Sequence, residues 1–139
     1  MREVSVYVKT EQIDKLGNKD TIKIKSNGKM YDKNGETYIV YKEKLGNEEE
    51  SVTTTIKISK EEVSIKRFGT VNSNMIFNKE KPSISRYHTG QGIFEIKIDT
   101  KKLDIIKHEG SMDIIINYDI NIVDLFEGYN NIKIEVLYK

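Results

Sequence analysis

An alternation of apolar and polar residues with a period of two recurs along the chain and limits the folds that it can adopt. Met112–Ile122 shows the pattern most clearly, because every second residue is apolar and most of the residues between are polar. Successive side chains of an extended strand point to opposite faces, so such a segment presents one apolar face. The sequence contains no convincing long helix pattern. The chain is therefore expected to be all-β.

Turn-forming residues separate the alternating segments at nearly regular intervals. Asn34-Gly35 is the strongest hairpin signal, since both central residues of a type I′ turn need positive φ. The predicted strands lie in Val4–Val8, Thr21–Ser26, Glu36–Leu45, Thr53–Ser59, Val63–Gly69, Met75–Phe77, Ile84–Thr89, Ile93–Thr100, Met112–Ile122 and Ile132–Tyr138.

Four further segments carry expectations of their own. Asn27-Gly28 is expected to interrupt the second strand, which Lys29–Lys33 could continue after a bend or bulge. Gly46–Ser51 is expected to be a polar loop. Leu103–Lys107 fits a short strand or a helical turn, and Asp124–Asn131 fits a loop or a single helical turn.

These segments predict a single antiparallel up-and-down β-barrel of about eight to ten strands over residues 1–139, with a two-sheet sandwich as the alternative. Strands near both ends of the chain allow the first and the last to pair, which would remove exposed edges. A barrel of about eight strands is either filled by side chains or holds one small ligand.

Composition excludes several classes of function. The chain has no cysteine, so neither a disulfide framework nor a thiolate zinc site is possible. Its 23 basic and 22 acidic residues give a net charge of +1, which makes nucleic acid an unlikely partner. No apolar run has the length of a membrane span or of a signal-peptide core. A cytoplasmic protein without a membrane partner is expected, and its oligomeric state stays open.

Arg67 is the most informative residue of the pattern. It shares one strand face with Val63 and Ile65, where an apolar residue is expected. Glu43 stands in the same way beside Ile39 and Tyr41 on the preceding strand. An unpaired charge inside a barrel is very costly, so the two residues should pair with each other or with a ligand. A structural ion pair and a ligand anchor both satisfy this requirement.

Aromatic and histidine residues add few candidates. Tyr41, Tyr87 and Tyr118 lie on or near inward faces and are candidates for lining a ligand site, with simple core packing as the alternative. His88 and His108 have no partners at the spacing of a metal or catalytic site, so we expect surface or structural histidines. No metal ligand, cofactor site or catalytic residue is predicted.

Six segments stand in a distinctive order and spacing: Tyr38–Glu43 (YIVYKE), Thr53–Ser59 (TTTIKIS), Val63–Gly69 (VSIKRFG), Met75–Phe77 (MIF), Arg86–Ile96 (RYHTGQGIFEI) and Ile114–Ile120 (IIINYDI). In these segments the chain resembles the YwiB-like family of small uncharacterised bacterial β-barrel proteins. The resemblance implies a calycin-type, lipocalin-like antiparallel barrel. Since the family has no assigned activity, it implies no catalytic residues.

Three functions fit these observations. The first is binding of a small amphiphilic or anionic molecule in the barrel, anchored by Arg67 and lined by Tyr41, Glu43, Tyr87 and Tyr118. The second is a non-catalytic structural or protein-interaction module with a filled core. The third is an enzyme that uses Glu43 as a general acid or base, which would need a second reactive group.

Overall fold

The computed structural model describes residues 1–44, 51–70 and 72–139. It contains ten strands: β1 (Arg2–Asp14), β2 (Lys19–Lys33), β3 (Glu36–Lys44), β4 (Ser51–Ile58), β5 (Val63–Gly69), β6 (Ser73–Phe77), β7 (Ser83–Thr89), β8 (Gly92–Lys107), β9 (Ser111–Ile122) and β10 (Phe126–Tyr138). The predicted loop over residues 46–51 lies outside the described residues, except for Ser51, which begins β4. The all-β prediction is confirmed.

All ten strands belong to one antiparallel sheet in the order β6-β5-β4-β3-β2-β1-β10-β9-β8-β7. The predicted pairing of the first and last strands is confirmed, because β1 lies beside β10 from Val4 to Asp14. The two ends of the sheet, β6 and β7, face each other, and one antiparallel bridge joins Asn72, just before β6, to His88 of β7. The sheet is therefore a nearly closed up-and-down barrel.

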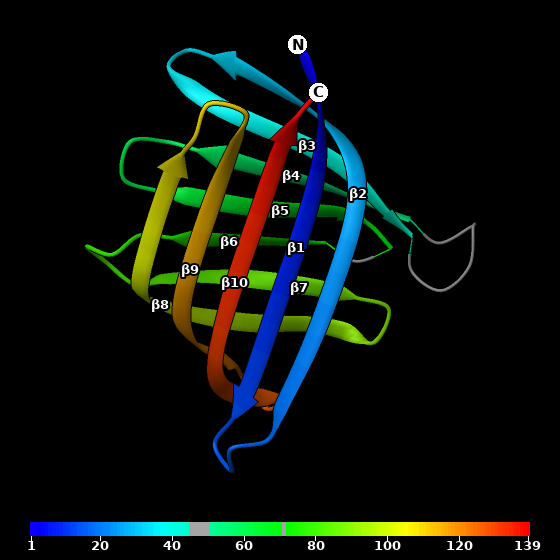
Figure 1. Ribbon diagram of the computed structural model, residues 1–139. Helices are drawn as coiled ribbons and strands as arrows, with labels where there is room; N and C mark the ends of the chain where they lie inside the picture. The colour runs from blue at the N-terminus through cyan, green and yellow to red at the C-terminus, as the bar shows by residue number, and fades with distance from the viewer. Residues whose placement is uncertain (45–50, 71) are drawn as a thin grey trace.

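The barrel is flattened into two layers that cross each other (Figure 1). In the front layer β1, β9 and β10 run upright, with β2 on one side and the later part of β8 on the other. Strands β4, β5, β6 and β7 run across behind them. The two layers enclose the core between their inward faces.

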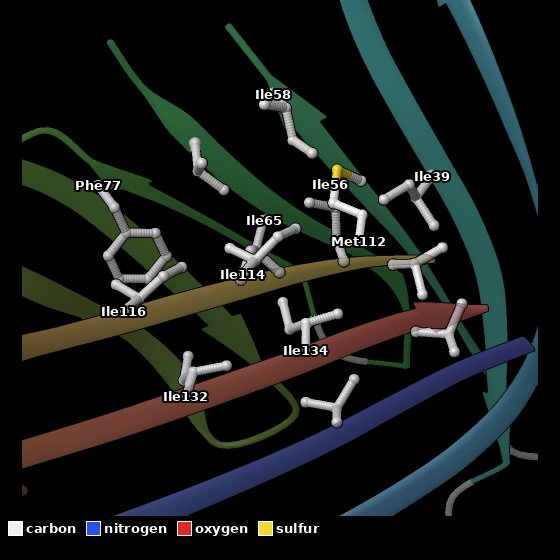
Figure 2. Packing of buried hydrophobic residues seen from close by; sticks show 14 of the residues in the cluster. Ile39, Ile56, Ile58, Ile65, Phe77, Met112, Ile114, Ile116, Ile132 and Ile134 are labelled. Carbon is white, nitrogen blue, oxygen red and sulfur yellow. The ribbon is translucent and has the colours of Figure 1, made fainter. Parts of the chain in front are cut away.

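The core consists almost entirely of side chains at every second position of the strands. Figure 2 shows that the side chains of the two layers converge on this space. The contributing residues with labels there are Ile39, Ile56, Ile58, Ile65, Phe77, Met112, Ile114, Ile116, Ile132 and Ile134. The period-two pattern thus predicted the inward faces correctly.

The predicted interruption of the second strand is wrong. Strand β2 runs without a break through Asn27 and Gly28, and it pairs continuously with β1 and then β3. Glycine is needed there because a Cβ atom on Gly28 would lie 2.6 Å from the backbone oxygen of Val40. The glycine marks a close approach of two strands.

The two undecided segments near the C-terminus are both extended. Leu103–Lys107 continues β8 beyond an irregularity in the ladder between Thr100 and Lys102. Most of Asp124–Asn131 belongs to β10, which begins at Phe126, so the prediction of a loop or a single helical turn is wrong. The Asn34-Gly35 turn is confirmed, with φ values of 54° and 80°.

Candidate functional site

Three neighbouring strands bring the predicted charge pair together. In the ladder, Tyr41 of β3 lies opposite Thr54 of β4, and Thr54 lies opposite Arg67 of β5. Glu43 follows Tyr41 on the same face, since side chains of a strand alternate. The inward positions of Glu43 and Arg67 are therefore a direct result of the register.

The two charged side chains form an ion pair with good hydrogen-bond geometry. The Arg67 guanidinium donates through Nη2 to Glu43 Oε2 at 3.1 Å, and the Thr54 hydroxyl donates to Glu43 Oε1 at 3.0 Å. The Glu43 side chain is 6% exposed, whereas that of Arg67 is 26% exposed. Each oxygen of the buried carboxylate thus has a donor, which offsets part of the cost of burying the charge.

Arg67 retains hydrogen-bonding capacity that the described residues do not use. Its Nε atom is buried and has no hydrogen-bond partner in the described part of the chain. A buried donor without a partner costs about 1–3 kcal/mol. Since a quarter of this side chain is exposed, the guanidinium extends from the buried carboxylate toward the surface.

Tyr41 lies in the same inward row and is 5% exposed. Burial raises the pKa of its phenol well above the ordinary range, and the negative charge of Glu43 raises it further. The phenol therefore stays neutral at physiological pH. It can donate a hydrogen bond or provide a flat apolar surface, but it cannot act as a base.

Tyr118 belongs to a different polar pair in the core. Its hydroxyl accepts a hydrogen bond from Asn130 Nδ2 at 3.2 Å, and its ring packs at a tilt against Phe77, with 4.7 Å between the ring centroids. Burial raises the pKa of Tyr118 to about 12. In the described residues no hydrogen bond connects this pair to Glu43 or Arg67.

Tyr87 likewise has no hydrogen bond to Glu43 or Arg67 among the described residues. It is opposite Phe94 in the ladder of β7 and β8, half-buried, and packs against the core. The structure thus joins Glu43 and Arg67, places Tyr41 beside them, and gives Tyr87 and Tyr118 core positions. Whether any of the five residues binds a ligand stays a prediction.

Sequence reasoning did not assign Thr54 and Asn130 to polar clusters. Thr54 could have been recognised, because it shares the inward face of β4 with Ile56 and Ile58. Asn130 could not, since its segment was expected to be a loop. It is 2% exposed, and its Oδ1 atom has no hydrogen-bond partner in the part of the chain that is described.

Among the grooves of the described surface, four have volumes of about 320 to 690 Å³. Neither Arg67 nor Glu43 lines any of them, and Tyr41 lines one beside Gly28 and Val40. None of these four grooves therefore opens at the guanidinium.

The two histidines belong to no metal-binding cluster in the described part of the chain. Within residues 1–44, 51–70 and 72–139 no three His, Asp or Glu side chains gather as metal ligands would. His108 Nε2 lies 3.3 Å from Asp113 Oδ2 at the surface, and His88 is exposed at the bridge to Asn72. Over the same residues the structure has no helix with the length and apolar character of a membrane span.

Comparisons with known proteins agree on the family. The family described as Domain of unknown function (DUF1934) matches residues 6–134. The uncharacterized β-barrel protein YwiB of Bacillus subtilis (strain 168) is 31% identical over 133 residues, which are 94% of this chain and 90% of that protein.

The crystal structure of the ywiB protein from Bacillus subtilis superposes with a TM-score of 0.85 and 26% identity, over 99% of this chain and 92% of that one. This similarity confirms the nearly closed antiparallel barrel, and the match to the family extends over most of the strands. The chain therefore belongs to the DUF1934 family of uncharacterised β-barrel proteins.

Proposed function

We propose that this protein binds a small anionic molecule, and that the Arg67 guanidinium at the wall of the barrel holds the anionic group. The observation that carries the proposal is the buried Nε of Arg67, which has no partner among the described residues. A guanidinium presents its donors as a planar fork that fits a carboxylate or a phosphate. A bound oxyanion would supply the missing acceptor.

Glu43 positions Arg67 in this arrangement. Its carboxylate accepts a hydrogen bond from one terminal nitrogen of the guanidinium at 3.1 Å and another from the Thr54 hydroxyl. Because the ion pair is already neutral, only the remaining N–H donors of the Arg67 guanidinium would hold an added anion. The partial exposure of the Arg67 side chain would let the anion reach them. This favours a small anion over a ligand with several negative charges.

The packed interior narrows the class of ligand. The inward faces supply a continuous apolar core, and Arg67 lines none of the four grooves named above. A long apolar tail would have to displace core side chains, which costs packing energy. The ligand is therefore a compact anion rather than an extended amphiphile.

Native mass spectrometry of protein purified without denaturation tests the proposal. We expect a retained small acid, or an increase in thermal stability on adding acetate or inorganic phosphate. Arg67→Ala should abolish this effect, whereas Lys66→Ala should keep it, since Lys66 is the exposed neighbour on the outer face. Equal responses of both variants, or no response of the natural protein, would overturn the proposal.

A structural or interaction module with a filled core is the second candidate function. The tight core and the complete pairing of both Glu43 oxygens favour it. Replacing both Glu43 and Arg67 by leucine distinguishes the two. If the pair is only structural, this exchange should be neutral or stabilising and should leave function intact. If Arg67 holds an anion, the exchange should abolish binding.

An enzyme that uses Glu43 receives less support. Its carboxylate is bound by Arg67 and Thr54, and among the described residues no second reactive group joins this cluster. The cytoplasmic location and the relation to calycins stay predictions from the sequence.

A further inference from the structure

The later part of β8 has a partner strand on one side only. Its first part pairs with β7 from Gly92 to Ile98, and Ile96–Lys107 pairs with β9 except at Lys101. Beyond the irregularity at Thr100–Lys102, the described residues provide no strand on the other side. Figure 1 shows this part of β8 as the outermost upright strand, on the side of the front layer opposite β2.

The turn that ends β8 determines which backbone groups point outward. The N–H of His108 donates to the carbonyl of Ser111 at 2.9 Å, so these residues occupy a hydrogen-bonded pair. Hydrogen-bonded and non-hydrogen-bonded pairs alternate along an antiparallel ladder. The non-hydrogen-bonded pairs of β8 therefore contain Leu103, Ile105 and Lys107, whose backbone N–H and C=O groups point away from β9. Such a row is a template for another extended backbone.

A groove of about 320 Å³ lies beside this edge. Leu103 and Ile105 form its apolar wall, and the turn between β4 and β5 together with the segment after β6 forms its polar rim: Ser59, Lys60, Glu61, Glu62, Lys79 and Glu80. Carboxylates thus exceed ammonium groups on the rim. Glu62 accepts a hydrogen bond from Asn78 at 3.4 Å, but in the described residues no ion pair neutralises a carboxylate of this rim.

We propose that a second copy of this chain occupies the edge and that the two β8 strands pair in antiparallel orientation, centred on Ile105. This register places Leu103 opposite the second copy's Lys107 and each Ile105 opposite the other. All the outward N–H and C=O groups of these three residues then find partners. The two sheets become continuous across a two-fold axis, as in an isologous dimer.

Charge complementarity favours this register. Lys107 has the same face parity as Leu103 and Ile105, so the second copy's Lys107 would lie on the groove side, beside the rim with its one carboxylate in excess. On the outer face, Asp104 lies opposite the second copy's Ile106, which is 42% exposed in the single chain. A pairing centred on Asp104 would instead oppose two carboxylates, which is unfavourable.

Sedimentation equilibrium from micromolar to millimolar concentration tests the dimer. We expect a reversible monomer–dimer equilibrium, because a short strand pairing buries little surface. Lys107→Glu should weaken the dimer by about tenfold or more, since it places a carboxylate beside the acidic rim. Lys97→Glu is the matched control and should leave the equilibrium unchanged, because Lys97 lies on the same strand in the part that β7 covers.

Hydrogen exchange at two protein concentrations locates the interface. The amides of Leu103, Ile105 and Lys107 should exchange freely in dilute solution and become protected as the dimer forms. Those of Asp104 and Ile106, which face β9, should be protected throughout. A monomer over the whole concentration range, or a dimer that leaves the first three amides unprotected, would overturn the proposal.

Discussion

The Glu43–Arg67 pair differs physically from the ion pairs on the outer face of the barrel. In the Lys101–Asp99 pair both side chains are more than half exposed, at 51% and 56%. Exposed pairs contribute about 0.2–1 kcal/mol, because water screens the charges and the side chains lose entropy. Glu43 is almost completely buried, so the loss of its partner leaves an uncompensated charge in the core.

Arg67→Ala should therefore lower the free energy of unfolding by about 3 kcal/mol. The value is at the lower end for a buried pair, because Thr54 still donates to Glu43 and Arg67 is partly exposed. Combining it with Glu43→Gln should recover part of the loss, and Lys101→Ala should change stability by less than about 0.5 kcal/mol. Urea denaturation measures all three, and a negligible effect of Arg67→Ala would show that the carboxylate is solvated.

Tyr118 makes stability depend on pH in the alkaline range. Burial raises its pKa from 10.0 to about 12. As pH rises, the Tyr118 phenol therefore ionises in the unfolded chain before it ionises in the folded protein. The stability of the fold that depends on the neutral phenol is fully present below about pH 10 and is lost between pH 10 and 12. One pKa unit corresponds to about 1.4 kcal/mol, so the loss is about 3 kcal/mol.

Tyr118→Phe removes this dependence and isolates it from other groups that titrate there. The difference in unfolding free energy between the natural protein and the variant should shrink by about 3 kcal/mol between pH 9 and pH 12. A difference that stays constant would mean that the phenol ionises in the folded state as it does in the unfolded chain. At neutral pH the variant should be less stable, because Asn130 Nδ2 loses its acceptor.

The period of two was sufficient to place Glu43, Arg67 and Tyr41 on one interior face, because parity along a strand is a local property. It was not sufficient to place Tyr118 beside Asn130. That contact depends on the register of β9 and β10, and Gly128 and Asn130 resemble loop residues when viewed one segment at a time. The Nδ2 group of Asn130 is tolerated inside because it donates a hydrogen bond to the buried phenol.

At the scale of the elements, the strands depart from the prediction where neighbouring strands determine their length. Strand β10 begins at Phe126 although its first residues include a glycine, because β9 is long enough to pair with them. Strand β8 continues beyond Thr100 because β9 remains beside it. Local propensity did not reveal either extension, since ladder hydrogen bonds with a distant segment supply the stabilisation.

The close approach of β2 and β3 at Gly28 leads to a testable prediction. Its added Cβ would lie 2.6 Å from the oxygen of Val40 and 3.1 Å from the Cβ of Tyr41, so Gly28→Ala should separate β2 from β3 locally. We expect a destabilisation of about 1–3 kcal/mol. Gly110→Ala is the control and should change stability by less than about 0.5 kcal/mol, since no atom beyond the adjoining residues lies within 4 Å of an added Cβ. Equal effects of the two substitutions in thermal unfolding would contradict the close approach.

At the scale of the whole molecule, the weakest point of the barrel lies between strands that are consecutive in sequence. The chain termini meet in the extensive β1–β10 ladder, whereas β6 and β7 form the seam. Backbone hydrogen bonds close this seam only between Asn72 and His88, at 3.0 and 2.8 Å, among the described residues. Sequence pattern predicted closure but not the position of the seam, because the strand at each edge has the same alternation as the others.

The seam should therefore open before the rest of the barrel. Amides of β6 and β7 should exchange with solvent at least about tenfold faster than those of β1 and β10, which have ladder partners on both sides. Ser83→Ala should accelerate exchange in β6 and β7 further, because the Ser83 hydroxyl donates to the carbonyl of Ile76 across the seam at 2.7 Å. Ser85→Ala, on the same face of β7, removes a hydroxyl that has no described partner and should have no such effect. Uniform protection over all strands, or equal responses to the two substitutions, would show that side-chain packing rather than these few hydrogen bonds holds the barrel closed.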